Sequence, residues 1–187
     1  MRLFQYLIFF LAISCFKSIG QSNDCDSIFW TANRKLSWLD FKAKPDTTVN
    51  FWAVSRPAMS YKSNLQNDTL KILTSCRFIT CKSWTKSHGV NLLKHEQTHF
   101  DIAEYCRRLY TQKLLTITFN SQNVMQTIDN IYKEVIKFRS ELDAKYDRET
   151  NFSRNEMIQD HWTKDITKKI IGLQDFETTS VTIILKQ

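Results

Sequence analysis

The chain of 187 residues contains only 3 Gly and 2 Pro. Flexible linkers and low-complexity segments are rich in glycine, proline or a few repeated polar residues, so the sequence excludes a protein built mainly from them. The sequence also has no C-x-x-C pair, which argues against a zinc site built from thiolates. Its 42% hydrophobic and 24% charged residues fit one globular domain with a hydrophobic core.

Long apolar runs are missing as well, with one exception at the amino terminus. Arg2 precedes an apolar run from Leu3 to Phe16, and small residues stand at positions −3 and −1 of a cut after Gly20. The run is shorter than the ~20 residues of a membrane span and has the pattern of a secretory signal peptide. We therefore predict a signal peptide at 1–20, a single domain at 21–187, no membrane span, and an exported protein that is periplasmic or secreted.

The cysteines fit this expectation of export. Four of them follow the expected cleavage site, namely Cys25, Cys76, Cys81 and Cys106. In an exported chain this even number permits two disulfides, and three pairings are possible that the sequence does not rank. A lipid anchor on Cys15 is the lesser alternative to a cleaved signal, because the bulky aliphatic residue usual three positions before such a cysteine is missing.

The excess of positive charge is moderate, with a net charge of +7. Lysine and arginine are spread through the chain rather than gathered in one cluster. Such a distribution is typical of a solvated surface, so we predict no nucleic-acid partner. The sequence does not indicate an oligomeric state.

One stretch carries a strong chemical signal, the H-E-x-x-H motif formed by His95, Glu96 and His99. On a helix each residue advances about 100°, so His99 lies about 40° from His95 on the same face and both imidazoles can bind one ion. Glu96 lies about 100° from His95 and about 60° from His99, close to the ion but not aligned with its ligands. The motif therefore predicts a Zn²⁺ site with His95 and His99 as metal ligands and Glu96 as the catalytic general base.

The remaining patterns predict an α+β fold, in which a small antiparallel β-sheet is followed by three helices and a C-terminal strand. Alternating or β-branched stretches indicate strands, and apolar residues three and four apart indicate amphipathic helices. The expected strands are Leu36–Lys42, Phe51–Lys62 with a break at Pro57, Thr69–Trp84 and Val181–Leu185, and the expected helices are Asn91–Leu115, Ser121–Tyr146 and Ser153–Gly172. A capping box formed by Ser153 and Glu156 would start the third helix.

A catalytic zinc ion usually has three protein ligands and a water, so a third ligand must come from outside the motif. Within the motif helix, Glu104 lies about 180° from the first histidine and Asp101 about 160° from the second, so neither can share the ion. Asp147, His161 and the flanking carboxylates of the second helix are the remaining candidates, Asp147 either as a ligand or as a hydrogen-bond acceptor for one. The sequence leaves this choice open.

Four stretches of the chain share their pattern with one family. Three of them are Leu36–Lys42, Lys82–Trp84 and His95–Glu104. The fourth follows the pattern Y-D-x-x-T-x-H-G-x-N-x-x-x-Q-x-x-W, matched in register by Tyr146, Asp147, Thr150, Asn155, Gln159 and Trp162. Through these stretches the chain resembles the secreted bacterial family of domain of unknown function 922, which is grouped with zinc-dependent proteases. Phe152 and Ser153 stand where that family commonly has His and Gly.

The motif and the resemblance lead to one functional hypothesis and one alternative. The hypothesis is an exported zinc-dependent metallopeptidase with a zincin-like domain, in which a zinc-bound water attacks a peptide or protein substrate and Glu96 accepts its proton. The substrate would lie along an edge strand beside the motif helix. The alternative is a catalytically lapsed or non-catalytic domain for metal binding or interaction at the cell envelope, because Phe152 replaces the family's histidine and cannot bind metal.

Overall fold

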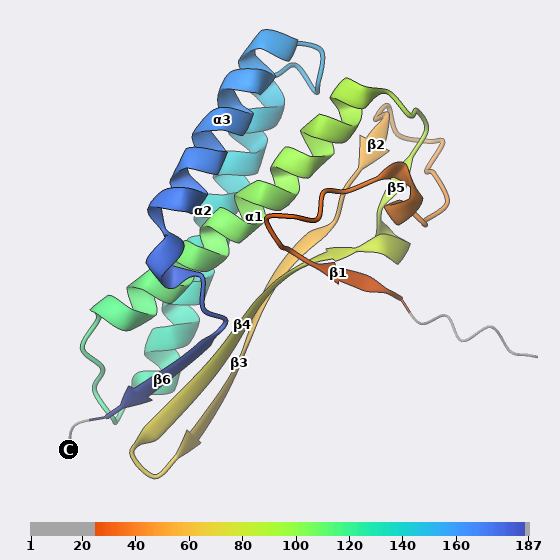
Figure 1. The fold of residues 1–187 in the computed structure, drawn as a ribbon. Coiled ribbons are helices and arrows are strands. Elements are labelled where there is room, and N and C mark those ends of the chain that lie inside the picture. Colours follow the sequence, from red (N-terminus) through yellow and green to blue (C-terminus); the bar gives the residue numbers. More distant parts are fainter. Residues whose placement is uncertain (1–24, 186–187) are drawn as a thin grey trace, which may run out of the picture.

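A twisted antiparallel sheet and a layer of three helices form the two sides of the molecule (Figure 1). The computed structural model describes residues 25–185. The main sheet contains β1 (Ser27–Phe29), β3 (Pro57–Gln66), β4 (Thr69–Ile79) and β6 (Ser180–Ile184). β3 pairs along one edge of β4, while β1 and β6 pair with the two ends of its other edge. β2 (Ala53–Val54) and β5 (Trp84–Thr85) form a separate small sheet. The predicted α+β class and the predicted C-terminal strand are confirmed.

The long hairpin of β3 and β4 follows from a regular alternation of side chains. Alternate residues of β4 from Leu70 to Phe78 are buried against the helices, and those between them lie on the other face. Asn67 and Asp68 join the two strands, and Asn67 adopts a left-handed conformation with φ 52°, as asparagine does in tight hairpin turns. The predicted break at Pro57 is the point where β3 begins.

Leu36–Lys42 is not the strand that its alternation predicts, because it contains a short 3₁₀ helix, η1 (Trp38–Asp40). Asp40 Oδ2 accepts hydrogen bonds from the backbone N–H and the hydroxyl of Ser37, at 2.8 and 3.2 Å. Arg34 adds an ion pair to Asp40 at 2.8 Å. Local bonds from side chains to the backbone offer a segment an alternative to a strand ladder, and here they decide the outcome.

The helices agree with the prediction to within a few residues. α1 (Val90–Thr116) packs between the sheet and the other two helices, α2 (Val124–Glu149) and α3 (Glu156–Gly172) (Figure 1). Apolar residues at helical spacing form the buried face of α2. This helix continues past the expected end at Tyr146, so Asp147 belongs to its last turn.

The start of α3 differs from the prediction, since Ser153 is not the N-cap. Asn155 takes this position, and its side-chain oxygen accepts a hydrogen bond from the Ile158 N–H at 3.3 Å. Ser153 has a left-handed backbone with φ 71°, whereas an N-cap residue needs an extended one. The capping box between Ser153 and Glu156 was therefore a wrong prediction.

One disulfide joins Cys25 to Cys81, while Cys76 and Cys106 are buried thiols. Of the two disulfides that four cysteines permit, the structure forms one. It links the start of the described chain to the 3₁₀ helix η2 (Thr80–Lys82), which leads into β5. The predicted signal peptide and Cys15 lie outside the described residues. Among residues 25–185, no helix is both long and apolar enough to cross a membrane.

Candidate functional site

Helix α1 presents its two motif histidines side by side, as their i, i+4 spacing predicts. The Nε2 atoms of His95 and His99 are 3.2 Å apart, and the two ring planes are nearly perpendicular at 87°. His95 is 4% exposed and stacks on Tyr146 of α2, with 4.5 Å between the ring centroids. This stacking fixes the ring of His95 with its Nε2 toward His99.

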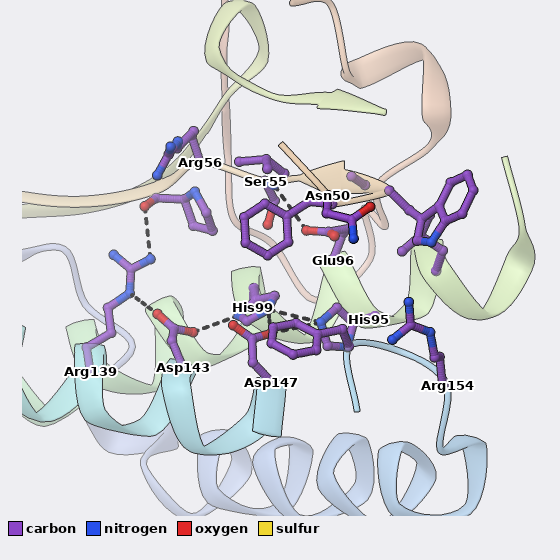
Figure 2. A pocket seen from close by; sticks show the side chains of 17 residues that line it. Asn50, Ser55, Arg56, His95, Glu96, His99, Arg139, Asp143, Asp147 and Arg154 are labelled. Carbon is purple, nitrogen blue, oxygen red and sulfur yellow. Dashed lines mark hydrogen bonds and ion pairs between the residues drawn. The ribbon is translucent and has the colours of Figure 1, made fainter. Parts of the chain in front are cut away.

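Helix α2 supplies a carboxylate to both histidines (Figure 2). Asp147 Oδ1 lies 3.1 Å from His95 Nε2 and 3.0 Å from His99 Nε2. These three residues, called the histidine cluster below, lie close enough together to hold one metal ion. Of the two residues named as candidates for a third ligand, the structure thus brings Asp147 to the histidines. His161 is exposed on α3 and does not line the pocket around them.

Asp143, one turn before Asp147, is a site residue that the sequence analysis did not single out. Its Oδ1 accepts a hydrogen bond from His99 Nδ1 at 2.8 Å, and its Oδ2 lies 3.3 Å from Nε of Arg139. Arg139 in turn donates to the carbonyl oxygen of Pro57 at 3.0 Å. The signal for Asp143 was its i, i+4 spacing from Asp147, which equals the spacing of the histidines that the pair faces.

The three converging atoms of the histidine cluster are short of hydrogen-bond donors. While His99 is neutral and its N–H at Nδ1 is used toward Asp143, its Nε2 has a lone pair that faces Asp147 Oδ1, another acceptor. At most one proton, on His95 Nε2, can lie between the three atoms while both rings are neutral. His95 Nδ1 is buried and has no hydrogen-bond partner among residues 25–185. A cation between the three atoms would satisfy all of them at once.

The charges in the histidine cluster also favour a cation between its three atoms. Burial opposes the charged form of His99, but hydrogen bonds to Asp143 and Asp147 outweigh this and raise the pKa of His99 from 6.5 to about 10. Burial also opposes the charged form of Asp147, but its hydrogen bonds to His95 and His99 outweigh it and lower the pKa of Asp147. The cluster therefore attracts positive charge, whether a proton or a metal ion.

The spacing of these atoms fits a tetrahedral metal ion. Bonds of about 2.0–2.1 Å from zinc to nitrogen or oxygen place neighbouring ligand atoms about 3.3 Å apart. The three distances within the cluster are 3.0, 3.1 and 3.2 Å. A metal-binding histidine usually donates its second N–H to a carboxylate, as His99 does to Asp143. The residues present therefore fit zinc.

Glu96 and the cluster line one pocket of about 530 Å³. Its opposite wall is the segment 50–57, which includes β2 (Figure 2). Glu96 is 4% exposed, and its Oε2 accepts a hydrogen bond from the Ser55 N–H at 3.0 Å. Glu96, the predicted general base, thus lines the same pocket as the three converging atoms without being one of them.

A second buried polar group on α1, the Glu104 cluster, consists of Glu104, Arg107 and Arg108. Glu104 accepts hydrogen bonds from Arg107 at 2.8 Å and from Arg108 at 2.9 Å. Arg107 also donates to Thr74 Oγ1 at 3.2 Å and to the Thr178 carbonyl at 3.0 Å. Glu104 is thus fully engaged away from the histidines, in agreement with the helix geometry that excluded it as a ligand.

The turn between α2 and α3 brings Phe152 to the pocket. Residues 151, 152 and 153 all have left-handed backbones, with φ of 48°, 52° and 71°, a conformation that costs a residue other than glycine roughly 1–2 kcal/mol. The Phe152 ring lines the pocket and lies 6.1 Å from the ring of Phe51 on the opposite wall. The glycine that the family commonly has at position 153 would suit this backbone better than Ser153 does.

Comparison with known families found a match for the middle of the chain. Residues 80–154 match the model of the family described as bacterial protein of unknown function (DUF922). This part runs from η2 to the turn after α2 and so contains the histidine cluster, Glu96 and Asp143. Searches among curated proteins and among solved structures found no match. The match agrees with the resemblance read from the sequence motifs and supports the DUF922 family for this part of the chain.

Proposed function

We propose that this protein is an exported zinc-dependent metallopeptidase that hydrolyses peptide bonds in peptide or protein substrates. The observation that carries the proposal is the convergence of His95 Nε2, His99 Nε2 and Asp147 Oδ1 in a pocket that also holds the buried carboxylate of Glu96. Donor atoms for a cation and a separate proton acceptor thus share one pocket, as hydrolysis assisted by a metal requires.

Zinc suits this set of two imidazoles and one carboxylate better than magnesium or calcium, which prefer oxygen ligands alone. His95, His99 and Asp147 would hold the ion, and Asp143 would orient His99 through its hydrogen bond at Nδ1. When bound, zinc would polarise the scissile carbonyl and lower the pKa of a water molecule to about 7.

Glu96 would take a proton from the attacking water and pass it to the leaving amine. The Ser55 N–H fixes Oε2 of Glu96, so Oε1 would carry the proton. The side chain is nearly inaccessible to solvent, which keeps the transferred proton from exchanging with bulk water.

The pocket wall favours an extended peptide as the substrate. The Lys86 N–H donates to the Trp52 carbonyl at 2.7 Å, and β2 pairs with β5 in the same register. Because bonded and non-bonded pairs alternate in an antiparallel ladder, the N–H and C=O of Ala53 point away from β5. They point to the side on which the Ser55 N–H reaches Glu96. A substrate strand could therefore pair with Ala53 next to the base.

A non-catalytic domain for metal binding or interaction at the cell envelope is the second candidate. Phe152 favours it, since the family commonly has a histidine there and phenylalanine offers no ligand. Under the peptidase proposal, Asp147 supplies the third donor atom instead, so a histidine at position 152 is not required.

Two variants test the peptidase proposal against the second candidate. The wild type should hold about one zinc per chain and cleave a broad peptide pool. Glu96→Gln should keep the zinc but lose roughly 10²–10⁴-fold in turnover, since Gln can form hydrogen bonds but cannot accept the proton. His99→Ala should lose both the zinc and the activity. Metal analysis and mass spectrometry of the digested pool measure these outcomes.

Glu141→Gln is the matched control, because Glu141 is exposed on α2 outside the pocket. It should leave zinc content and turnover unchanged. Equal trace metal in the wild type and in His99→Ala would remove the metal site. Zinc bound without any turnover would favour the second candidate, and unchanged turnover in Glu96→Gln would exclude Glu96 as the base.

A further inference from the structure

We infer that the pocket selects peptides carrying a carboxylate, and that Arg154 binds this carboxylate at the end of the pocket next to His95. The inference rests on the proposed peptidase function and adds the class of substrate. The carboxylate could belong to an acidic side chain or to a free carboxyl terminus, because an arginine fork recognises both in the same way.

The balance of charges in the pocket points to an anion. Three carboxylates line the pocket, and all of them have partners: Glu96 accepts from Ser55, Asp143 from His99, and Asp147 lies against both histidines. Three arginines also line it. Side-chain charges of the two signs thus cancel, and a divalent cation in the cluster would make the pocket positive. A positive pocket attracts anionic substrates.

The three arginines differ in what they bind. Arg139 is already engaged, with Asp143 at 3.3 Å and the Pro57 carbonyl at 3.0 Å. The guanidinium groups of Arg56 and Arg154 have no hydrogen-bond or ion-pair partner within residues 25–185. All three line the pocket, and in the view of Figure 2 Arg154 lies on the side of His95, whereas Arg56 and Arg139 lie toward the other side. Arg154 is therefore the unpaired cation next to the candidate metal ligands on the His95 side.

The turn that carries Arg154 is fixed to the same helix end as Asp147. The Phe152 N–H donates to the Asp147 carbonyl at 2.9 Å, and the Asn155 N–H donates to the Thr150 carbonyl at 2.8 Å. These bonds hold the three left-handed residues that precede Arg154. Costly backbone conformations are found at functional sites when the surrounding structure enforces them. The backbone at Arg154 is thus fixed relative to the helix end that carries Asp147, and its exposed side chain extends from this fixed turn.

The aromatic residues at the pocket mouth would strengthen an ion pair there. Phe51, Trp52 and Phe152 line the pocket and are 49%, 56% and 44% exposed. An extended substrate covering these rings would exclude water from the guanidinium of Arg154. Charges attract more strongly where water is excluded, so this pairing would be worth more than one on an open surface.

Binding to the full-length Glu96→Gln protein loaded with zinc tests the inference without requiring turnover. The probe is a randomised hexapeptide library prepared in two forms, with free carboxyl termini and with carboxamide termini, and mass spectrometry identifies the retained peptides. We expect carboxylate-bearing peptides to be retained at least about tenfold better than neutral ones, as for a hydrogen-bonded charge pair. Better retention of the form with free carboxyl termini would identify the terminal carboxylate as the group bound. Enrichment of Asp or Glu within the amidated peptides would identify an acidic side chain instead.

Three further substitutions, each added to the Glu96→Gln protein, test whether Arg154 is the source of the carboxylate preference. Arg154→Gln should abolish the carboxylate preference and Arg154→Glu should reverse it toward basic peptides. Arg148→Gln, which changes an exposed arginine in the last turn of α2 outside the pocket, should leave it unchanged. Loss of the preference in Arg56→Gln but not in Arg154→Gln would overturn the assignment, as would equal retention of acidic and neutral peptides or no retention at all.

Cleavage of the same library by the wild type separates this inference from the proposed function. Cleavage without a carboxylate preference would overturn the inference and leave the peptidase intact. A carboxylate preference that depends on Arg154, without cleavage, would support the inference and count against the peptidase.

Discussion

Helix α1 carries two buried polar groups that differ in how completely their atoms are paired. In the Glu104 cluster the carboxylate accepts from both arginines, and Arg107 also donates to a threonine and to backbone carbonyls. In the histidine cluster two ring nitrogens and a carboxylate oxygen face one another with at most one proton between them while both rings are neutral, and His95 Nδ1 has no partner among residues 25–185. The Glu104 cluster lies wholly in α1 and is buried, whereas the histidine cluster also includes Asp147 of α2, whose side chain is 32% exposed.

This difference shows which property marks a candidate site. Charged and polar side chains of α1 occur in both clusters, so their presence alone does not mark a site, whereas the count of donors against acceptors separates the two. The Glu104 cluster meets the cost of taking charges out of water with its own hydrogen bonds, and its role is structural. In the histidine cluster the chain's own hydrogen bonds compensate only in part for the loss of water. A cation from outside the chain would supply the missing interactions.

The largest effect on stability is expected from breaking the Glu104 cluster. Arg107→Met should lower the free energy of unfolding by about 3–5 kcal/mol, since it leaves a buried carboxylate short of a partner. The loss should be the same with and without zinc, as measured by denaturant unfolding. Lys113→Met, which removes an exposed ion pair of α1, is the control and should cost less than about 1 kcal/mol. If the loss in free energy of unfolding differed with and without zinc, the two clusters would be energetically coupled, and the prediction would be wrong.

Zinc removal should act on the histidine cluster alone and have the next largest effect. At a zinc concentration 100-fold above Kd, the bound ion should add about 2.7 kcal/mol to the free energy of unfolding, and a chelator should remove this gain. Thermal unfolding with and without the chelator measures it. The chelator should change the thermal unfolding of Asp147→Ala only slightly. Asp175→Ala, which changes an exposed aspartate outside the pocket, should be destabilised by the chelator as much as the wild type is. A full response in Asp147→Ala would exclude Asp147 as a ligand.

A smaller effect is expected from Asp143→Asn, which weakens the hydrogen bond that orients His99. Loss of such a partner usually lowers metal affinity 10–100-fold. Competition with a zinc indicator dye measures the affinity, and Asp129→Asn, an aspartate of α2 outside the pocket, is the control. Unchanged affinity in Asp143→Asn would mean that the packing against Tyr146 and α2 suffices to orient the ring.

The smallest effect is expected from Phe152→His, which restores the residue common in the family. Because Asp147 already lies at 3.0–3.1 Å from both histidines, a further imidazole should change zinc affinity less than Asp143→Asn does. The same indicator titration checks this. A large gain in affinity together with new peptidase activity would mean that the histidine cluster is incomplete without position 152, and that the present chain is a lapsed enzyme.

The sequence predicted the histidine cluster as far as local geometry determines it. The i, i+4 spacing placed His95 and His99 on one face, and the same geometry excluded Glu104, which the structure places in a different cluster. Asp147 was a candidate but could not be ranked against His161, because that choice depends on which face of α2 meets α1. Asp143 was not singled out among the flanking carboxylates of the second helix, because the expected helix ended at Tyr146, which hid its alignment with Asp147.

Contacts between distant segments were beyond prediction from the sequence. Nothing local in Asn50–Pro57 indicates that the Ser55 N–H reaches Glu96 on another element. The expected strand at Leu36–Lys42 failed because Ser37 and Asp40 bond each other locally, and alternation takes no account of such bonds. The fold class was predictable since the strand and helix periods are long and clear.

The position of β6 has a consequence for the newly made chain. β6 completes the edge of β4 between Thr69 and Leu73, yet its residues 180–184 are synthesised after all three helices. Until then, this edge keeps free N–H and C=O groups that can pair with strands of other molecules. We therefore expect a chain interrupted after α3 to contain every residue of the histidine cluster and still to aggregate through the uncovered edge of β4.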